Sequence, residues 1–262
     1  MQKLLIRLLI LVPDFFKLVG IKVFIRIGLS LLFGKSKVRF NFRGHILGLR
    51  ATKSDFQVFH SIYGGLEFDY IRSFIGKYTD RKILIVDAGA FIGISTRYFS
   101  ELGSNIHVEA FEPSPTNFEM LVTNTKNMSN VVIHNRALTS HGLDVSVYDR
   151  GTGPWGHSLI SNSDGVSFDE LAVVNSSKLT DVLAGYEGWL KILKLDIEGG
   201  ELDLLSHADR WMDRFDLVVA ELHPQISPQI PRLWYEATSG MKLIHLTTEK
   251  VCAVREWNSG ET

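Results

Sequence analysis

The chain has 262 residues, 45% of them hydrophobic and 22% charged, a composition that excludes a disordered chain and suffices for one sizeable core. The single cysteine, Cys252, excludes an internal disulfide, and its apolar neighbours predict a buried side chain rather than a nucleophile. The net charge of −1 is unevenly spread. Residues 1–39 hold eight Lys or Arg against one acid, a net +7 that leaves −8 on the rest of the chain.

The first 34 residues are apolar and basic, and Pro13 divides them into two predicted helical pieces. Charges interrupt them too often for a transmembrane helix, which needs about 18 apolar residues, and Arg7 breaks the region that a secretory signal would need. Two interpretations remain. The helices pack on the following domain or close its active site, or they form a basic amphipathic surface on an anionic membrane. The second would place a cytoplasmic protein peripherally on the inner face of a membrane.

The alternating segment Val38-Arg39-Phe40-Asn41-Phe42 predicts a strand near the end of this region. We expect a basic and hydrophobic, helical N-terminal extension with its strand over residues 1–49, and one catalytic domain over residues 50–262. From residue 82 onward, short apolar segments alternate with helical spacing, which predicts a doubly wound α/β sheet that is mostly parallel. The predicted strands cover residues 83–86, 106–111, 131–134, 191–195 and 217–222.

Glycines punctuate residues 140–165, which we interpret as a hairpin followed by a flexible loop that covers the site. Two more strands are predicted at residues 242–246 and 251–255. Only four residues separate them, too few for a crossover helix, so we expect an antiparallel pair.

The strongest local motif is Asp87-Ala88-Gly89-Ala90-Phe91-Ile92-Gly93, where an apolar strand ends in an acid and a glycine turn opens a helix. Glycines in such a turn let the backbone approach a ligand closely. The spacing of Gly89 and Gly93 does not match G-x-G-x-x-G, which disfavours a dinucleotide site. An ordinary glycine-rich turn is the plainer interpretation of the same residues.

Glu112 stands at the carboxyl end of the next predicted strand, 23 residues after Gly89. An acid at this place accepts hydrogen bonds from both ribose hydroxyls of a nucleoside. Ser114 suits a helix N-cap and Pro115 the first helical position, so a helix should follow directly. The alternative is a solvated surface acid. Together with the glycine turn, Glu112 predicts a nucleoside-binding edge.

Two later strands also end in polar groups. The polar residues that follow them are Asp196, Glu198, Glu201, Glu221 and His223. Because ligands of open α/β sheets bind at the carboxyl ends of strands, we expect these side chains in the same crevice as the glycine turn. Glu201 also suits the first turn of a helix, where capping would be its only role. His223, beside so many acids, is a candidate base.

These acids raise the question of a metal. Asp196, Glu198, Glu221 and His223 form an oxygen-rich set of the kind that binds Mg²⁺. Acid clusters at strand ends also bind only a cofactor or cap a helix, and we assign no residue as a metal ligand. Mg²⁺ remains the alternative to a metal-free site.

The ordered set of motifs resembles that of the FkbM-type methyltransferases. The resemblance rests on the glycine turn at residues 87–93, Phe111-Glu112-Pro113, Lys194-Leu195-Asp196-Ile197-Glu198-Gly199-Gly200-Glu201 and Glu221-Leu222-His223, with Thr52-Lys53-Ser54-Asp55, Tyr63, Glu67 and Leu179-Thr180-Asp181-Val182-Leu183 in support. It spans roughly residues 50–225 and does not cover residues 1–49. Phe91 departs from the family, which usually has Asn there.

The resemblance implies a class I methyltransferase fold, a Rossmann-like sheet whose last strand is antiparallel. It implies S-adenosylmethionine as cofactor and methyl transfer to a hydroxyl oxygen on a sugar, a glycan or a secondary metabolite. The residues that we expect to bind the cofactor are Asp87, Gly89, Phe91, Gly93, Glu112, Pro113, Ala137 and Asp196. The expected catalytic residues are His223, Asp196, Glu198, Lys194 and Glu221. Either His223 or Asp196 would take the acceptor proton.

Three alternatives stay open, a non-catalytic cofactor-binding protein of the same fold, a nicotinamide-dependent oxidoreductase and a nucleic-acid methyltransferase. The complete set of acids argues against the first, and the glycine spacing argues against the second. The acidic body argues against the third, although the basic N-terminal region keeps it open. We expect a small-molecule or glycan acceptor and no nucleic acid as partner.

Overall fold

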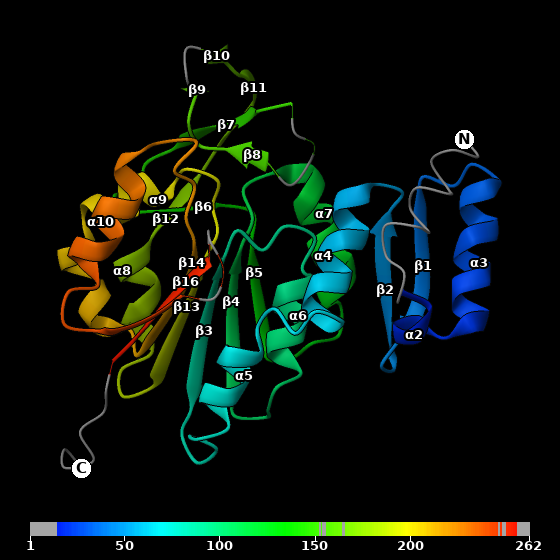
Figure 1. Cartoon of the computed structure of the whole chain (residues 1–262), viewed down its shortest axis with the longest axis horizontal. Coiled ribbons are helices and arrows are strands. Elements are labelled where there is room, and N and C mark those ends of the chain that lie inside the picture. The colour runs from blue at the N-terminus through cyan, green and yellow to red at the C-terminus, as the bar shows by residue number, and fades with distance from the viewer. Residues whose placement is uncertain are drawn as a thin grey trace.

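A computed structural model describes residues 15–151, 153, 156–163, 166–245, 247 and 250–255. In this part of the chain, a seven-stranded sheet lies between two layers of helices (Figure 1). In spatial order its strands are β15 (Lys242–His245), β16 (Lys250–Val254), β14 (Leu217–Glu221), β13 (Leu190–Leu195), β3 (Ile83–Ala88), β4 (Ile106–Phe111) and β5 (Val131–His134). Every predicted strand of the catalytic domain is present, with ends no more than two residues from the prediction among described residues.

The strand directions follow one rule with one exception. Strand β16 pairs antiparallel with both of its neighbours, β14 and β15, whereas β14, β13, β3, β4 and β5 pair in parallel. Strand β15 therefore runs in the parallel direction, and β16 alone is reversed among the described strands of this sheet. The predicted doubly wound, mostly parallel sheet with an antiparallel last strand is confirmed, as is the antiparallel pair near the C-terminus.

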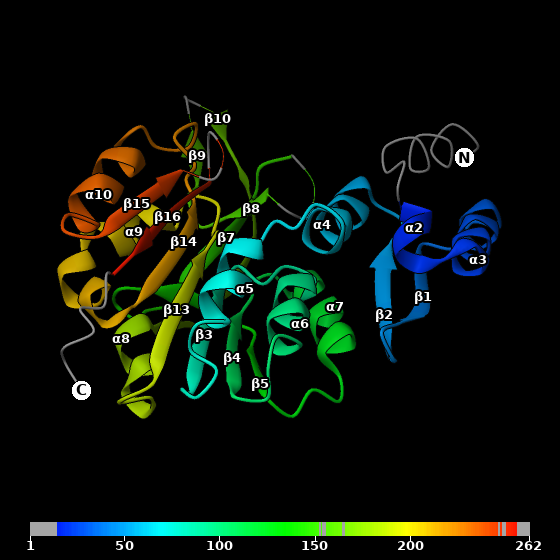
Figure 2. The same ribbon diagram turned by 60° about the horizontal axis from the view of Figure 1, so that its bottom comes forward.

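Helices cover both faces of the sheet (Figure 2). Alternate side chains of a strand point to opposite faces, so Ile83 and Ile85 of β3 join one apolar cluster and Leu84 and Val86 the other. The helices of the first cluster are α4 (Lys53–Tyr63), α5 (Asp69–Ile75), α6 (Ile94–Ser100) and α7 (Pro115–Thr125). Those of the second are α8 (Leu179–Val182), η2 (Leu183–Gly185), α9 (Glu201–Ser206), η3 (Ala208–Arg210), η4 (Met212–Arg214) and α10 (Gln229–Ala237).

The described part of the N-terminal extension lies at one end of the molecule, next to α4 and α7 (Figures 1 and 2). Its elements are α2 (Phe15–Val19), α3 (Ile21–Leu32), β1 (Lys37–Phe42) and β2 (His45–Arg50), and β1 pairs antiparallel with β2. Buried side chains alternate along β1, as its sequence predicts. The rings of Phe40 and Phe42 contact Phe59 of α4, with centroid distances of 6.0 and 5.0 Å.

The helical break predicted at Pro13 lies outside the described residues. Within them, α2 and α3 separate at Gly20, whose φ is +80°. The predicted division after residue 49 falls near the end of β2 and stays a prediction. No helix in the described part of the chain is long and apolar enough to cross a bilayer.

The glycine-punctuated segment contains the predicted hairpin, since β7 (Val145–Asp149) pairs antiparallel with the next strand, β8 (His157–Ser158), but the segment predicted as a loop is more regular than expected. Short paired strands continue through much of its described part, in small sheets above the carboxyl end of the main sheet (Figure 1). Its strands and their partners are β6 (Ala137–Thr139), β7 (Val145–Asp149), β8 (His157–Ser158), β9 (Asn162–Ser163), β10 (Val166–Ser167), β11 (Asp169–Val174) and β12 (Ser176–Lys178). Strands β8, β9 and β10 have only two residues each, too short for an alternating pattern, so the sequence predicts neither these strands nor the pairing of β9 with β10.

Candidate active site

A cavity of about 670 Å³ opens at the carboxyl ends of β3, β4, β13 and β14. The predicted site residues that line it are Gly89, Phe91, Glu112, Pro113, Ala137, Lys194, Asp196, Glu198, Glu221 and His223. Segments more than 100 residues apart in sequence thus meet at one crevice, as the parallel topology requires. Two predicted residues, Asp87 and Gly93, are not among its lining residues. They lie at the two ends of the glycine turn, Asp87 in β3 and Gly93 directly before α6.

The glycine turn is fixed by close contact with the end of β13. Gly89 has φ +77°, and a Cβ on it would lie 1.7 Å from the backbone oxygen of Asp196. Gly93 has φ +82°, and its Cβ would lie 2.6 Å from Cδ1 of Leu121 on α7. Glycine is needed at both places for backbone conformation and for space. The turn is therefore more than an ordinary strand-to-helix connection, because it presses against the acid-bearing strand.

Asp87 anchors the helix that follows the turn. Its fully buried carboxylate accepts hydrogen bonds from Ser95 Oγ at 2.8 Å and Thr96 Oγ1 at 2.7 Å. Lys194 Nζ lies 3.4 Å from Asp87 Oδ1 and donates to the Gly89 oxygen at 2.6 Å. Burial opposes the charge of Lys194, but the carboxylates of Asp196 and Asp87 outweigh it and raise its pKa. The lysine ties β3, the turn and β13 together.

Phe91 holds a backbone conformation that is unusual for its type. Its φ of +52° lies in the left-handed region, which Asn and Gly adopt more readily than Phe. The Arg50 guanidinium lies over the ring, 5.1 Å from its centroid. The amide of Phe91 donates to Glu112 Oε2 at 2.8 Å. Phe91 thus adopts a conformation in which Asn, the residue expected here from the resemblance, is more common, while its ring packs against Arg50.

Glu112 is buried, with only 5% of its surface exposed, which rules out a solvated surface acid. Besides Phe91, the amide of Ser114 donates to Oε1 at 2.9 Å and the Asn117 amide group at 3.3 Å. Burial raises the pKa of Glu112 to about 7, although these hydrogen bonds oppose the shift. A carboxylate has about four acceptor positions and three are taken, so Glu112 keeps one, on Oε2, for a hydroxyl donor from the cavity.

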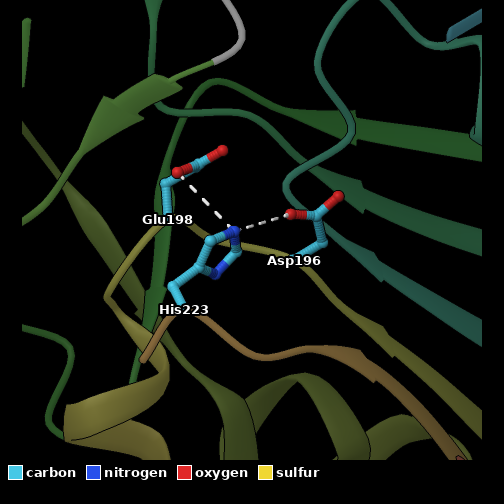
Figure 3. A group of neighbouring side chains, drawn as sticks. All are labelled: Asp196, Glu198 and His223. Atoms are coloured by element: carbon cyan, nitrogen blue, oxygen red, sulfur yellow. Dashed lines mark ion pairs between the residues drawn. The ribbon is translucent and has the colours of Figure 1, made fainter. Parts of the chain in front are cut away.

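His223 faces two carboxylates across the cavity floor (Figure 3). Its Nε2 lies 3.6 Å from Glu198 Oε2 and 3.9 Å from Asp196 Oδ1. On the opposite side of the ring, Nδ1 lies 3.0 Å from Glu201 Oε1. Burial opposes protonation, but Glu201 and the two facing carboxylates outweigh it and raise the pKa of His223 to about 10.

Glu201 has more than a capping role. It is fully buried, and its carboxylate also accepts the amides of Ile197 at 2.9 Å and Gly199 at 2.6 Å. It therefore orders the turn that carries Asp196 and Glu198 and also orients the imidazole. The sequence indicated the cap but not the contact with the histidine.

Glu198 is bound by a residue that sequence reasoning missed. Arg150, just after β7, places Nη1 2.5 Å from Glu198 Oε2. Glu198 has φ +49°, an uncommon conformation for a glutamate. Burial raises its pKa to about 7, against the charges of His223 and Arg150. The glycine-rich context of Arg150 marked a turn over the site, and no motif pointed to the arginine itself.

Two further polar residues that line the cavity, Lys250 and Gln57, were not indicated by any sequence motif. Lys250 Nζ lies 3.2 Å from Glu221 Oε2 and also pairs with Glu67. Burial, together with the charge of Asp196, raises the pKa of Glu221. Gln57 of α4 lines the cavity, and its buried Oε1 has no hydrogen-bond partner in the described structure. Such an acceptor indicates a place for a donor from a ligand.

The sheet order, its one reversed strand and the crevice at the carboxyl ends define a class I methyltransferase, a fold that uses S-adenosylmethionine. The chain belongs to the FkbM methyltransferase family, because the profile of the methyltransferase FkbM domain matches residues 87–242. The resemblance inferred from the motifs is confirmed, and it favours a methyltransferase over a nicotinamide-dependent oxidoreductase.

Two relatives are similar to most of the chain. The hexuronic acid methyltransferase AglP of Haloferax volcanii is 24% identical over 186 residues, which are 70% of this chain and 74% of AglP. Methyltransferase 1 of Beauveria bassiana is 29% identical over 197 residues, 64% of this chain and 78% of that protein. Among solved structures, a precorrin-6y C5,15-methyltransferase of Geobacter metallireducens has 11% identity and a TM-score of 0.40, with coverage of 71% and 88%.

Proposed function

We propose that this methyltransferase transfers the methyl group of S-adenosylmethionine to a hydroxyl oxygen of a sugar or glycan. The observation that carries the proposal is the single cavity shared by the glycine turn, Glu112 and the group Asp196, Glu198 and His223. The residues expected to bind the nucleoside of the cofactor thus lie in the same cavity as side chains that could accept a proton. The name of the relative AglP, a hexuronic acid methyltransferase, supports a saccharide acceptor. A secondary-metabolite hydroxyl is the other acceptor that this chemistry would suit.

The cavity suits the cofactor in size and in lining. Its volume of about 670 Å³ lies within the usual range of about 300–1,000 Å³ for cofactor and small-molecule sites. We assign a ribose hydroxyl to Glu112, and the amino-acid portion to the backbone of Gly89 and to the neighbouring Asp196. Phe91, Pro113 and Ala137 would form the apolar walls. When bound, S-adenosylmethionine supplies an electrophilic methyl group on a sulfonium that leaves without charge.

The remaining chemistry is orientation and removal of the acceptor proton. Asp196 is the most accessible acid of the cluster, with 33% of its side chain exposed, whereas His223 is only 4% exposed. We therefore assign the proton-accepting role to Asp196. His223, the other candidate, holds a proton near neutral pH because its pKa is about 10, so it could accept the acceptor proton only after losing its own. Glu198 and Glu221 would orient the acceptor, and Lys194 would hold Asp196 and the glycine turn in place.

A second candidate mechanism uses a divalent cation. One ligand atom each from Asp196, Glu198 and His223 lie within 4.8 Å of one another. Two carboxylates and one imidazole nitrogen suit Mg²⁺ or Mn²⁺, and Glu201 on Nδ1 would leave Nε2 free for a cation. Such an ion would lower the pKa of the acceptor hydroxyl. Loss of turnover with a chelator, restored by Mg²⁺ or Mn²⁺, would select this mechanism over the metal-free one.

We also propose a cytoplasmic location with peripheral contact to the inner face of a membrane through residues 1–34. The single cysteine suits a reducing compartment, and the extension combines apolar residues with an excess of Lys and Arg.

The function is tested by incubating the protein with S-adenosylmethionine labelled in the methyl group and with glycan fractions of the source cells. Mass spectrometry should find the label as an ether on a saccharide oxygen. Label in a methyl ester would move the acceptor to a carboxylate, and label in protein or nucleic acid would refute a saccharide acceptor. Calorimetry should show binding of S-adenosylhomocysteine and none of NAD.

A further inference from the structure

Helix α3 turns an apolar row of side chains toward solvent. Ile21, Ile25, Leu29 and Phe33 follow at intervals of four residues and are 58%, 53%, 49% and 79% exposed. This spacing aligns them along one side of the helix and the residue after it. The opposite side of α3 packs on the protein, because Ile27 and Leu31 are buried in the core cluster. The helix is thus held to the protein by one face while its other apolar row faces outward.

A row of positive charge runs beside the apolar row. Lys22 and Arg26 are exposed and also lie four residues apart, next to Ile21 and Ile25. From residue 15 to residue 54 the sequence holds nine Lys or Arg and no Asp or Glu. The partner of this face must therefore offer apolar contact and negative charge together.

A second copy of the chain does not meet this requirement, because face-to-face pairing would bring two positive rows together. An anionic membrane surface meets it, since headgroups attract Lys and Arg while apolar side chains enter the boundary with the acyl chains. Helix α3 has 12 residues and a length of about 18 Å at 1.5 Å per residue, too short to cross a bilayer and suited to lying in its surface.

We propose that the face formed by Ile21, Lys22, Ile25, Arg26 and Leu29, together with Phe33, docks on anionic phospholipid. The inference rests on the proposed peripheral attachment and assigns it to one helix face at the end of the molecule (Figure 2).

The docked face connects to the cavity through α4. Phe15 of α2 contacts Phe56 and Phe59 of α4, both with ring centroids 5.4 Å apart. Other residues of α4, among them Gln57 and His60, line the cavity. Docking would therefore hold the cavity close to the membrane surface, where an acceptor carried by a lipid is presented.

Flotation of the full chain with vesicles tests the docking. Vesicles of equal parts phosphatidylglycerol and phosphatidylcholine should carry the protein upward, and phosphatidylcholine alone should bind it at least about tenfold less, since each basic residue near the surface contributes about fivefold. The double variant Ile25→Asp with Leu29→Asp should lose about tenfold or more in binding. Lys22→Glu with Arg26→Glu should abolish the preference for the anionic lipid. The substituted side chains are exposed, so the fold should persist.

The matched control is Leu171→Asp with Val173→Asp on β11, two apolar residues that are also exposed but lie far along the chain. It should float like the unchanged protein. Absence of flotation, an equal loss in the control, or flotation that the α3 variants leave intact would overturn the proposal. Binding of S-adenosylhomocysteine, measured on the same variants without vesicles, should be unchanged. Weaker binding of S-adenosylhomocysteine by a variant would mean that its substitutions disturb the methyltransferase domain, so that its loss of flotation could not be assigned to the docking face.

Discussion

Nδ1 of His223 lies 3.0 Å from Oε1 of Glu201, so the carboxylate that begins α9 also orients the imidazole after β14. Because Glu201 accepts two backbone amides as well, it is held as an acceptor and fixes Nδ1 as the donor. Nε2 is thereby directed at Asp196 and Glu198 (Figure 3). Glu201 therefore connects the turn after β13, which carries Asp196 and Glu198, with the ring orientation of His223 after β14.

Replacing Glu201 with Gln should disturb this arrangement, because the amide group of Gln would face an N–H donor. We expect the free energy of unfolding to fall by about 1–3 kcal/mol, the usual effect of an unsatisfied buried polar group. Turnover should fall about 10²-fold through misplacement of His223, with little change in cofactor affinity. Urea unfolding, single-turnover kinetics and calorimetry measure the three effects.

The control for Glu201 is Asp203→Asn on the same helix, where Asp203 bonds Ser140 and is not among the residues that line the cavity. It should lower stability without changing the ¹⁵N shifts of the His223 ring in an NMR spectrum. If both variants shift that ring equally, or neither does, Glu201 does not position His223.

Cofactor affinity should depend on pH through Glu112, whose pKa burial raises to about 7. The ionised carboxylate is the better acceptor for a ribose hydroxyl, so affinity for S-adenosylhomocysteine should fall about tenfold from pH 8 to pH 6. Calorimetry across this range, compared with Glu112→Gln, isolates the contribution of this group from that of the ligand's own amine. Equal slopes in the two proteins would exclude Glu112 from the ribose site.

The raised pKa of Glu112 also makes the free energy of unfolding depend on pH. For a salt-bridged acid, whose pKa is lowered, stability rises with pH, whereas the raised pKa of Glu112 makes stability fall with pH. The folded protein binds this proton more tightly than the unfolded chain, whose Glu has a pKa of 4.5. The contribution of Glu112 to stability is therefore fully present below about pH 4.5 and is lost as the pH rises through about 7. The free energy of unfolding of the unchanged protein should therefore fall from pH 5 to pH 8 by more than that of Glu112→Gln, whose side chain does not titrate. The variant itself should be less stable at pH 5, because the amide group of Gln would face the N–H of Phe91 or Ser114.

Much of the fold follows from the sequence because buried parallel strands are continuous apolar runs, as in β3, where all six residues are buried. The convergence of Glu112, Asp196 and His223 follows because parallel strands end at one edge. Arg150, Gln57 and the histidine contact of Glu201 could not be predicted, since each reaches the site through a tertiary contact without local periodicity or motif. The strands β8, β9 and β10 in the glycine-rich segment could not be predicted either, since two residues are too few for an alternating pattern.

Phe91 offers a test of backbone strain, because its φ of +52° suits Asn better than Phe. Phe91→Asn removes up to about 1–2 kcal/mol of strain but loses the stacking of Arg50, so stability should change by less than about 1 kcal/mol. Phe91→Val keeps an apolar side chain but is branched at Cβ and should be less stable than the Asn variant. Urea unfolding of both variants decides the matter. A more stable Val variant would show that apolar packing at this position outweighs the backbone conformation.

Gly89→Ala should displace both the glycine turn and the end of β13, which carries Asp196. A methyl group at this position would lie 1.7 Å from the backbone oxygen of Asp196, so the turn and the end of β13 must separate. Strain from φ +77° adds to the clash, and a loss of more than about 3 kcal/mol in unfolding free energy is expected. The separation would also move Asp196 away from the cofactor, and affinity for S-adenosylhomocysteine should fall about tenfold or more.

The control for Gly89 is Gly240→Ala, because Gly240 has φ +88° and nothing within 4 Å of the added Cβ. It carries the conformational strain without the clash and should lose only about 1 kcal/mol, with normal cofactor binding. Urea unfolding and calorimetry on both variants separate the two causes. Equal losses of stability would mean that strain alone accounts for Gly89. A stable Gly89→Ala protein that binds cofactor normally would contradict the close contact between the glycine turn and Asp196 on which the shape of the site depends.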